Sequence, residues 1–512
     1  VQTNVAMTSN AELSFRRTTK NTKNILTLMN LSAGREYVLA ISFANGETKG
    51  WDGYDMAVEC QYQRYREVAE KAPVLYSGRP MLDRFFQLAP MYHESLKTMD
   101  VPGAIRAQTT HYWVWGWDSM TSNDAAFYWG DHAFIGQMLE CMEKYSDSEK
   151  GIAHAFGRDM KNIDVAAPPA QGMYITLLDL YRLSGGEWQR HYPFAKKIFE
   201  MIEATEVRDT GLCRGTSLYP DFRALIKETG NDISAFNNTV SYCAIRSMEK
   251  LAESIGDEKT VAKAGKFAER MRDSFETVFY NKEAGFIDSS VDADTYAQRG
   301  VPSNNAVKWE NNFCRELVEL HAEDYLAFYE KELISPAGIR PLPEWNECYD
   351  ADSNQLHCWW PVMSEFYIRL TSSHDRADLL EQYMGWVEYW AERLMCPEGI
   401  PCYGNRKKVP FDAWNCMCGI WHGYSIRGFY NAIVHGYIGI DLDEDGLNIY
   451  PHTGEELTVE QLHFGDKTFD IEVRGSGAKI RSVTINGDCL GSVTNIPFER
   501  LREHNTIQII RE

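Results

Sequence analysis

The sequence of 512 residues lacks several patterns that define common classes of protein. It has no apolar run of about 18 residues, so no membrane-spanning helix is expected. Its 12 cysteines include no Cys-x-x-Cys pair, which excludes the usual zinc and thioredoxin-like motifs. No Gly-rich phosphate loop, Ser/His/Asp signature or basic-then-apolar leader pattern occurs. We therefore expect neither a metal nor a cofactor, and no membrane partner.

Positive charge is also scarce. Lysine and arginine together number 52 against 73 acidic residues, which gives a net charge of −21. Nucleic acids and anionic membranes bind to basic patches, so neither is an expected partner. The scattered cysteines are typical of buried thiols in a reducing compartment, which favours the cytoplasm. A periplasmic or secreted location would require that the start of the chain, which is not Met, is a processed end. No pattern indicates an oligomeric state.

Aromatic residues, in contrast, are abundant: they make up 12% of the chain, with 14 Trp and 27 Tyr. Most are expected in the core. Some aromatic residues occur beside acids in polar loops. A protein core would avoid the acid, and a solvated loop would avoid the aromatic ring. Sugar rings suit such places, since their C–H faces stack on indole and their hydroxyls bond to carboxylates. A carbohydrate is therefore the expected partner.

Three regions are predicted from the periodicity of apolar residues. Residues 1–56 contain short strands such as "ELSFRRTT" and "NILTLMNL", typical of the end of a β-sandwich. Residues 57–437 carry apolar residues at a spacing of three to four, which predicts twelve helical segments. Residues 438–512 return to strand patterns such as "TFDIEVRG", which predict a C-terminal β-domain. Within this last region, "DLDEDG" at 441–446 lacks the distal Glu of a calcium loop and is predicted to be a turn.

The connections between the predicted helices alternate in length. Short connections such as "SGGE" at 184–187 alternate with long aromatic ones such as 206–232 and 396–413. A closed ring of six helical hairpins, an (α/α)6 toroid, has this pattern, with its long loops gathered over one mouth. The predicted fold is therefore mainly α, with β-rich pieces at both ends and a pocket at the mouth.

The first candidate site is "HYWVWGWDSM" at 111–120, where Trp115 and Trp117 flank the single acid Asp118. We interpret Asp118 as an acceptor for sugar hydroxyls at the mouth of a pocket. The alternative is that it satisfies free N–H groups at the start of the next helix.

The second candidate is Asp221, in a Tyr-Pro-Asp-Phe turn of the 208–245 loop. Tyr219 and Phe222 would desolvate this carboxyl and raise its pKa, as a general acid requires. The alternative role for Asp221 is turn formation after the proline.

The third candidate tract covers residues 385–414. Glu392 ends a helix. The helix dipole disfavours a negative charge at this position, so an acid here suggests a functional role. Glu398 lies in a Pro-Glu-Gly turn and could equally be a solvated loop acid. Further aromatic residues in this tract and in the preceding 338–362 segment are candidates for sugar binding: Trp345, Trp359, Trp360 and Trp414.

Together these motifs resemble a known superfamily. The order "WGWDS", a Pro-Asp loop, "GIRPL…WWPV" and an acid-bearing last loop is similar to that of the six-hairpin glycosidases. Within them, glycoside hydrolase family 63 and the trehalase-like α-glycosidases are most alike. The segment 426–451 is similar to the junction between barrel and β-domain in disaccharide phosphorylases. The resemblance covers roughly residues 105 to 455.

The resemblance implies an inverting hydrolase that acts on an α-linked sugar. It implies that Trp117 and Asp118 hold the sugar ring, and that Asp221 is the general acid. The base would be Glu392 or Glu398, with Glu392 preferred.

Two alternatives stay open. One is a phosphorylase on the same barrel, with a phosphate site supplied by Arg406, Lys407, Lys408 and His422. The other is a polysaccharide lyase or an inactive carbohydrate-binding toroid, and the acidic net charge disfavours the lyase.

Overall fold

The computed structural model shows a chain of two compact units, Val1–Glu70 and Lys71–Glu512. It describes residues 6–9, 12–17, 24–29, 32–33, 39–42, 50–98, 101–108, 113–157, 159–162, 168–215, 229–351, 354–393, 395–402, 421–450, 455–475, 477 and 479–512. The boundary between the units lies later than the predicted residue 56. The reason is that helix α1 (Gly50–Lys71) groups with the N-terminal strands.

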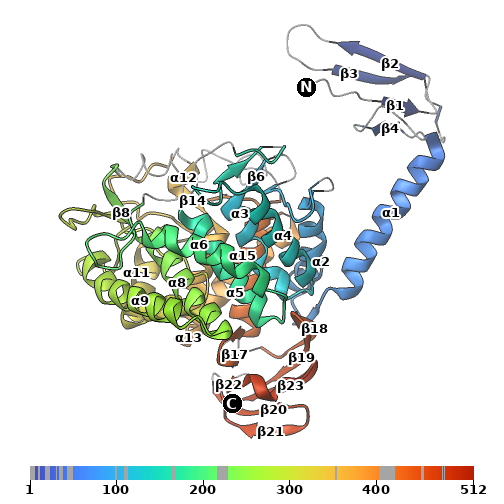
Figure 1. Ribbon diagram of the computed structural model, residues 1–512. Helices are drawn as coiled ribbons and strands as arrows, with labels where there is room; N and C mark the ends of the chain where they lie inside the picture. The colour runs from blue at the N-terminus through green and yellow to red at the C-terminus, as the bar shows by residue number, and fades with distance from the viewer. Residues whose placement is uncertain are drawn as a thin grey trace. The chain divides into compact units, whose positions relative to one another are not determined.

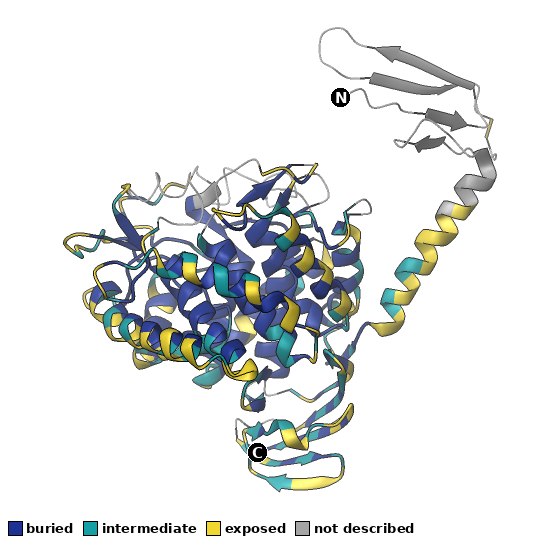
Figure 2. Cartoon of the chain, in the orientation of Figure 1, coloured by how far each residue is buried: buried dark blue, intermediate teal, exposed yellow. Residues whose placement is uncertain are grey.

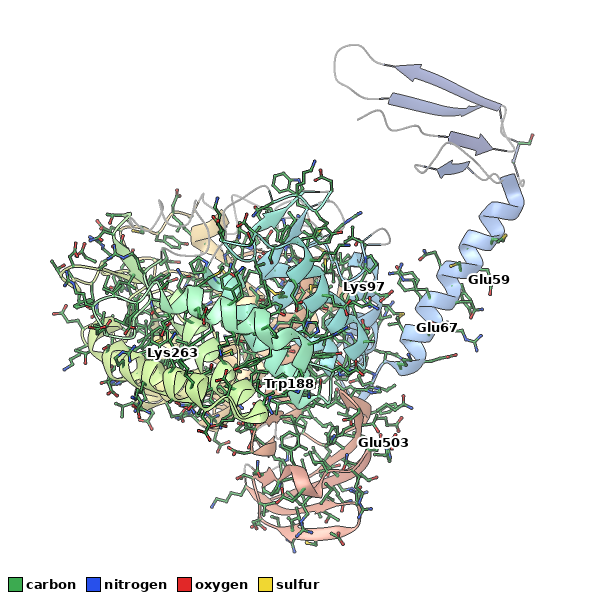
Figure 3. All side chains as sticks on the ribbon, viewed as in Figure 1. Glu59, Glu67, Lys97, Trp188, Lys263 and Glu503 are labelled. Carbon is green, nitrogen blue, oxygen red and sulfur yellow. The ribbon has the colours of Figure 1, made fainter. Side chains whose placement is uncertain are left out.

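The described part of the first unit contains two pairs of short strands. Strands β1 (Ala6–Ser9) and β4 (Leu39–Ser42) pair antiparallel, and so do β2 (Glu12–Arg17) and β3 (Asn24–Met29). Helix α1 follows and carries Glu59 and Glu67, which are labelled in Figure 3.

The body of the second unit is helical and has two kinds of helix (Figures 1 and 2). Helices α5, α8, α13 and α15 are buried along most of their length, whereas α6, α9 and α14 bury one face. Lys263 on α9, labelled in Figure 3, is one of the charged residues on a half-exposed helix. The helices are α2 (Pro80–Leu96), α3 (Gly116–Thr121), α4 (His132–Tyr145), α5 (Pro168–Leu183), α6 (Tyr192–Glu203), α8 (Ala235–Ile255), α9 (Glu258–Phe279), α10 (Arg315–Val318), α11 (Ala322–Phe328), α12 (Asn354–His357), α13 (Glu365–Ser373), α14 (Ala377–Glu392) and α15 (Gly423–Asn431).

The described helices and strands confirm a mainly helical fold with β elements at both ends. The contrast between fully buried and half-exposed helices agrees with a two-layered helical toroid. The closure of the layers into six hairpins stays a prediction.

The α8–α9 hairpin shows how local sequence places these helices. The side chain of Ser234 accepts a hydrogen bond from the Asn237 N–H and caps α8. Gly256 ends α8 with a φ of 74°, a left-handed conformation that glycine adopts without a Cβ clash. Asp257 then accepts from the Thr260 N–H and caps α9. The short "GDEK" connection therefore encodes a tight antiparallel turn.

A C-terminal sheet completes the second unit. Its six strands run in the order β21 (Asp488–Gly491), β20 (Ile480–Ile485), β23 (His504–Arg511), β19 (Lys467–Arg474), β18 (Leu457–Phe464) and β5 (Val74–Tyr76). A second sheet joins β16 (Ile440–Asp443), β17 (Gly446–Ile449) and β22 (Asn495–Ile496). The turn predicted at 441–446 is confined to residues 444 and 445, because 441–443 belong to β16 and 446 belongs to β17. Strand β5 was not predicted, since its partner β18 lies more than 370 positions away.

Short strand pairs lie among the loops of the helical body. They are β6 (Val114–Trp115) with β7 (Ala155–Phe156), β8 (Asp232–Ser234) with β11 (Ser290–Asp292), β9 (Tyr280–Asn281) with β10 (Phe286–Ile287), β12 (Ile334–Ser335) with β13 (Gly338–Ile339), and β14 (Cys358–Trp359) with β15 (Ile400–Pro401).

A buried ion-pair network lies in the centre of the helical body. The Nε of Arg427 donates to both oxygens of Asp124, at 2.8 and 2.7 Å. Glu365 accepts from the Nε of Arg369 at 2.8 Å, and Arg369 also pairs with Asp441 at 2.7 Å. Burial would raise the pKa of Glu365, but Arg369 and Arg427 outweigh it and lower that pKa to about 2. Glu365 therefore stays ionised at neutral pH although it and its arginine partners are buried.

Removal of one member of this network should be costly. In Arg427→Met, Asp124 loses its charge partner inside the protein, which typically costs about 3–5 kcal/mol of unfolding free energy. The matched control is Arg208→Met, because Arg208 and Asp294 form a pair that is 54% and 60% exposed. We expect the control to cost less than about 1 kcal/mol. Urea unfolding of both variants, followed by circular dichroism, measures the difference, and equal losses would contradict a structural role for the buried pair.

The cysteines and the membrane prediction can also be checked within the described residues. Each of the ten described cysteines is a free thiol, and eight of them are buried, in agreement with the predicted buried thiols. In this part of the chain, no helix combines the length and the apolar character that a membrane crossing requires.

Candidate active site

Three side chains from distant parts of the chain meet in the helical body: Asp118, Glu398 and His422. One carboxylate oxygen of each acid and one imidazole nitrogen of His422 lie within 4.8 Å of one another. All three are buried, with exposed fractions of 5%, 7% and 2%. The fold therefore places two carboxyl groups side by side in a site largely shielded from water.

Asp118 is positioned by a tight strand-to-helix turn. Strand β6 pairs with β7 and leads directly into α3, whose first turn carries Asp118. Gly116 donates its N–H to the His154 carbonyl, at 2.8 Å. A Cβ at Gly116 would lie 2.3 Å from the Ala153 carbonyl oxygen, so only glycine permits this approach. The motif "WGWDS" is thus a turn that points an acid inward.

Glu398 is held by the segment 395–402 and by the start of α15. Strand β15 pairs with β14, and the His422 N–H donates to the Cys396 carbonyl at 2.9 Å. The Ser425 hydroxyl reaches the backbone carbonyl of Glu398 at 3.4 Å. The Tyr424 hydroxyl donates to the Glu398 carboxylate at 2.7 Å, and the His422 Nε2 lies 3.9 Å from it. These contacts fix the direction of the carboxylate.

The electrostatics of the two acids are coupled. Burial, and after it the nearby charge of Glu398, raise the pKa of Asp118 to about 8. Two carboxylates this close share a proton more readily than they both ionise. With a pKa of about 8, Asp118 therefore keeps its proton at neutral pH. A proton on one acid beside a charged partner is the state that acid–base chemistry requires.

The same three side chains have the donor types of a divalent-cation site. Two carboxylates and an imidazole suit several metals. A cation here would have to displace the proton on Asp118, because metal ligands bind in their deprotonated form.

The predicted tryptophans differ in exposure. Trp117 is 0% exposed and packs against Phe236 and Tyr424, each with ring centroids 5.9 Å away. Trp359 is also 0% exposed, and its Nε1 donates to the Ser364 hydroxyl at 2.7 Å. Trp360 is 4% exposed. Their burial means that little of these three rings is open to a ligand, and their role in sugar binding stays a prediction. Trp117 forms the packed support beneath Tyr424.

Two other tryptophans are open to solvent. Trp115 is partly exposed and lies edge-on to His154, with centroids 5.0 Å apart. Trp345 is 58% exposed, and its Nε1 donates to Glu332 at 2.6 Å. Of these two, only Trp115 is close in sequence to Asp118.

Glu392, preferred from the sequence as the base, lies elsewhere. It is the last residue of α14, its side chain is 65% exposed, and it pairs with Arg393 at 3.1 Å. It is not part of the Asp118 cluster. Other predicted site residues lie outside the described residues: Tyr219, Asp221 and Trp414, and with them the basic trio Arg406, Lys407 and Lys408.

Sequence reasoning missed two members of the site. Tyr424, in "WHGYS", bonds to Glu398. Lys308 is fully buried, with its Nζ 5.9 Å from the centre of the Trp117 ring and 3.5 Å from Glu310. Burial lowers its pKa, and the nearby Arg427 adds to the effect. The pattern "KWE" at 308–310 could have signalled a buried pair, since its two charges flank a tryptophan.

Comparison with solved structures identifies the class of fold. The chain is similar to a mannosylglycerate hydrolase of glycoside hydrolase family 63 from Thermus thermophilus, solved with glucose. The identity is 12% and the TM-score 0.51, over 68% of this chain and 98% of that one. It is also similar to a glycosidase solved with glucose, at 12% identity and a TM-score of 0.51, over 69% of this chain and 96% of that one.

A third similar structure is a family 78 rhamnosidase from a Bacillus species. The identity is 14% and the TM-score 0.52, over 79% of this chain but only 42% of that longer one. These likenesses show the fold: the chain has the (α/α)6-type fold of glycoside hydrolases. No protein-family model matches the sequence, and no curated protein matches it.

Proposed function

We propose that the protein is a glycosidase whose reaction takes place at Asp118 and Glu398. The observation that carries the proposal is this pair of buried carboxyls, at most 4.8 Å apart and supported by aromatic rings, on a fold of glycoside hydrolases. Hydrolysis of a glycosidic bond needs a proton donor and a carboxylate. In this proposal Glu398 supplies the carboxylate, and Asp118 binds the sugar beside it.

Each residue has a distinct role in this proposal. Glu398, oriented by the Tyr424 hydroxyl, acts as the general base that activates water. Asp118 bonds to hydroxyls of the sugar ring and holds it against Glu398. Asp221 is the proposed general acid for the leaving oxygen, on the basis of the sequence resemblance. Glu398 replaces Glu392 as our choice of base, because Glu392 is exposed and ion-paired.

The separation of the acids bears on the stereochemistry. An inverting pair of acid and base lies roughly 6.5–9.5 Å apart, whereas a retaining pair lies roughly 5–5.5 Å apart. One oxygen of Asp118 and one of Glu398 lie within 4.8 Å of each other, and we propose that these two residues are not the inverting acid and base. An inverting reaction therefore requires a further acid, which is the role we propose for Asp221. We further propose inversion at an α-linked sugar.

The test is a screen of aryl glycosides and disaccharides, with and without phosphate. We expect hydrolysis at full rate without phosphate, and proton NMR should show the inverted anomer first. Dependence on phosphate would instead indicate a phosphorylase, in which phosphate replaces the activated water. Absorbance near 235 nm would reveal an unsaturated uronate, the product of a lyase. A first-formed anomer with retained configuration would overturn the role of Asp221 and assign both catalytic steps to Asp118 and Glu398.

A further inference from the structure

A second cavity lies deeper in the helical body. Its volume is about 470 Å³, within the range of roughly 300–1,000 Å³ that small-molecule sites occupy. Neither Asp118, Glu398 nor His422 lines it. Its walls come from α5, α13, α15 and the segment 310–319, and the β16–β17 hairpin closes one side. Figure 1 shows β6 and β14, which adjoin the Asp118 site, at one end of the second unit and β17 at the other.

The segment 308–310 separates the two sites. The Nζ of Lys308 faces the Trp117 ring, which supports the Asp118 site. Two residues later, Glu310 lines the deeper cavity. The cavity is therefore separate from the acid pair, although a single buried ion pair connects their walls.

Polar groups in the cavity wall lack hydrogen-bond partners although they are buried. Both carboxylate oxygens of Glu310 make no hydrogen bond, and Glu310 is 5% exposed. The Nη1 of Arg427 and the Oδ1 of Asn431 also make none, and these residues are 1% and 2% exposed. The Nη1 of Arg427 lies 3.5 Å from the carboxylate of Glu365. Buried polar groups are costly when unpaired, so these atoms indicate a bound partner.

The chemistry of these atoms selects the kind of partner. A metal ion would use only acceptors such as Glu310 and Asn431. An anion would use only the donors, which are the Nη1 of Arg427 together with the Nε of Arg315 and the Nη1 of Arg369. A hydroxyl group both donates and accepts, so a polyhydroxylated molecule satisfies both kinds at once. Phe127, Tyr128 and Phe464 line other parts of the cavity and suit the C–H faces of such a molecule.

The negative charge at the rim of the cavity limits which polyhydroxylated molecules can bind. The exposed acids Glu316 and Asp445 line the cavity, together with Asp443 and Glu444. This negative rim disfavours sugar phosphates and uronates. The buried acids of the cavity are paired with Arg427, Arg369 and Lys308. Because their negative charges are already balanced, the cavity requires no cationic ligand.

We propose that this cavity binds a small neutral polyhydroxylated molecule, a monosaccharide or polyol, at a site separate from Asp118 and Glu398. A π-helix supports the assignment: Ala432–Ile438 continues α15 as a π-helix and places His435 in the cavity wall. Such wide turns cost helix stability and are frequent at functional sites. The site stands independently of the reaction proposed above.

Isothermal titration calorimetry on the full chain, with xylitol and glucose as probes, tests the proposal. Asn431→Leu removes an acceptor at nearly constant volume, and Leu180→Trp places a large side chain in the cavity. We expect the dissociation constant for xylitol to rise roughly tenfold in Asn431→Leu. Leu180→Trp should abolish binding, whereas Asp118→Asn, the control for the other site, should leave xylitol binding intact. Circular dichroism checks that each variant folds.

Hydrogen exchange on the unmodified protein gives a second measurement, which does not depend on any variant. Xylitol should slow exchange in residues 440–449, which close the cavity, and not in 395–402, which carry Glu398. The proposal is overturned if neither polyol binds, which would mean that water fills the cavity. It is also overturned if Asp118→Asn abolishes all binding, or if only spermidine or inorganic phosphate binds.

Discussion

The Glu398→Gln variant is expected to fold normally and to lose roughly 10²- to 10⁴-fold in kcat/KM, the usual contribution of a general base. Glutamine keeps the shape of the side chain and can still accept the hydrogen bond from Tyr424, which is 2.7 Å long. It cannot take a proton from water. The loss should therefore appear mainly in kcat, measured with the best substrate from the glycoside screen.

Glu392→Gln is the matched control for this experiment. The two glutamates lie six positions apart, but the Glu392 side chain is 65% exposed and pairs with Arg393. Its replacement should leave kcat, KM and the melting temperature unchanged. Loss of activity in Glu392→Gln, with normal activity in Glu398→Gln, would show that the sequence-based choice of base was right and that our site is misassigned.

The Asp118→Asn variant should lose roughly 10- to 150-fold in kcat/KM. At pH values above its pKa of about 8, Asp118 is ionised and its charge-assisted hydrogen bonds to sugar hydroxyls are worth about 1.5–3 kcal/mol each, so the loss is expected there, because asparagine keeps the shape but weakens these bonds. Because such bonds tighten as the ring distorts, the loss concerns the transition state more than the ground state. Steady-state kinetics on one substrate measure it. An unchanged kcat/KM would remove Asp118 from the site.

The same variant should gain stability relative to the wild type as the pH rises. The folded protein holds the pKa of Asp118 at about 8, above the value near 3.8 expected in the unfolded chain. The unfolded chain thus releases its proton first, and the wild-type protein loses stability as pH rises from about 4 to about 8. Asparagine has no proton to lose, so its advantage over Asp118 should grow across this window by on the order of a few kcal/mol. Urea unfolding of both proteins at pH 5 and pH 8 measures it.

This result would separate two interpretations of the motif. From the sequence, Asp118 was expected at the mouth of a pocket, where replacement would barely change stability. The structure shows an exposed fraction of 5% and a charged neighbour, so its ionisation is costly. A variant that is less stable than the wild type at both pH values would indicate a structural role at the start of α3.

Much of the architecture follows from local patterns. The apolar spacing of three to four predicted the helical body, and the alternating stretches predicted strands such as β19 and β23. The Gly256 and Asp257 pair encodes the turn between α8 and α9 through backbone conformation and capping. These features need only neighbours in the chain, so the sequence by itself determines them. The motif around Asp118 and the acid-bearing loop near 398 were likewise visible as acids among aromatic residues.

Tertiary packing decided what the residues of the site do. The sequence favoured Glu392 over Glu398 as the base, whereas the pairing of β14 with β15 and the position of Tyr424 bury Glu398. The ring of Trp117 packs between Phe236 and Tyr424, and this tertiary contact shows that it supports Tyr424. Asp124 and Arg427 lie 303 positions apart, and β5 reaches its partner strand across most of the chain. Burial and charge pairing arise from such long-range contacts, which no local pattern encodes, and they set the pKa of Asp118 and the polarity of the deeper cavity.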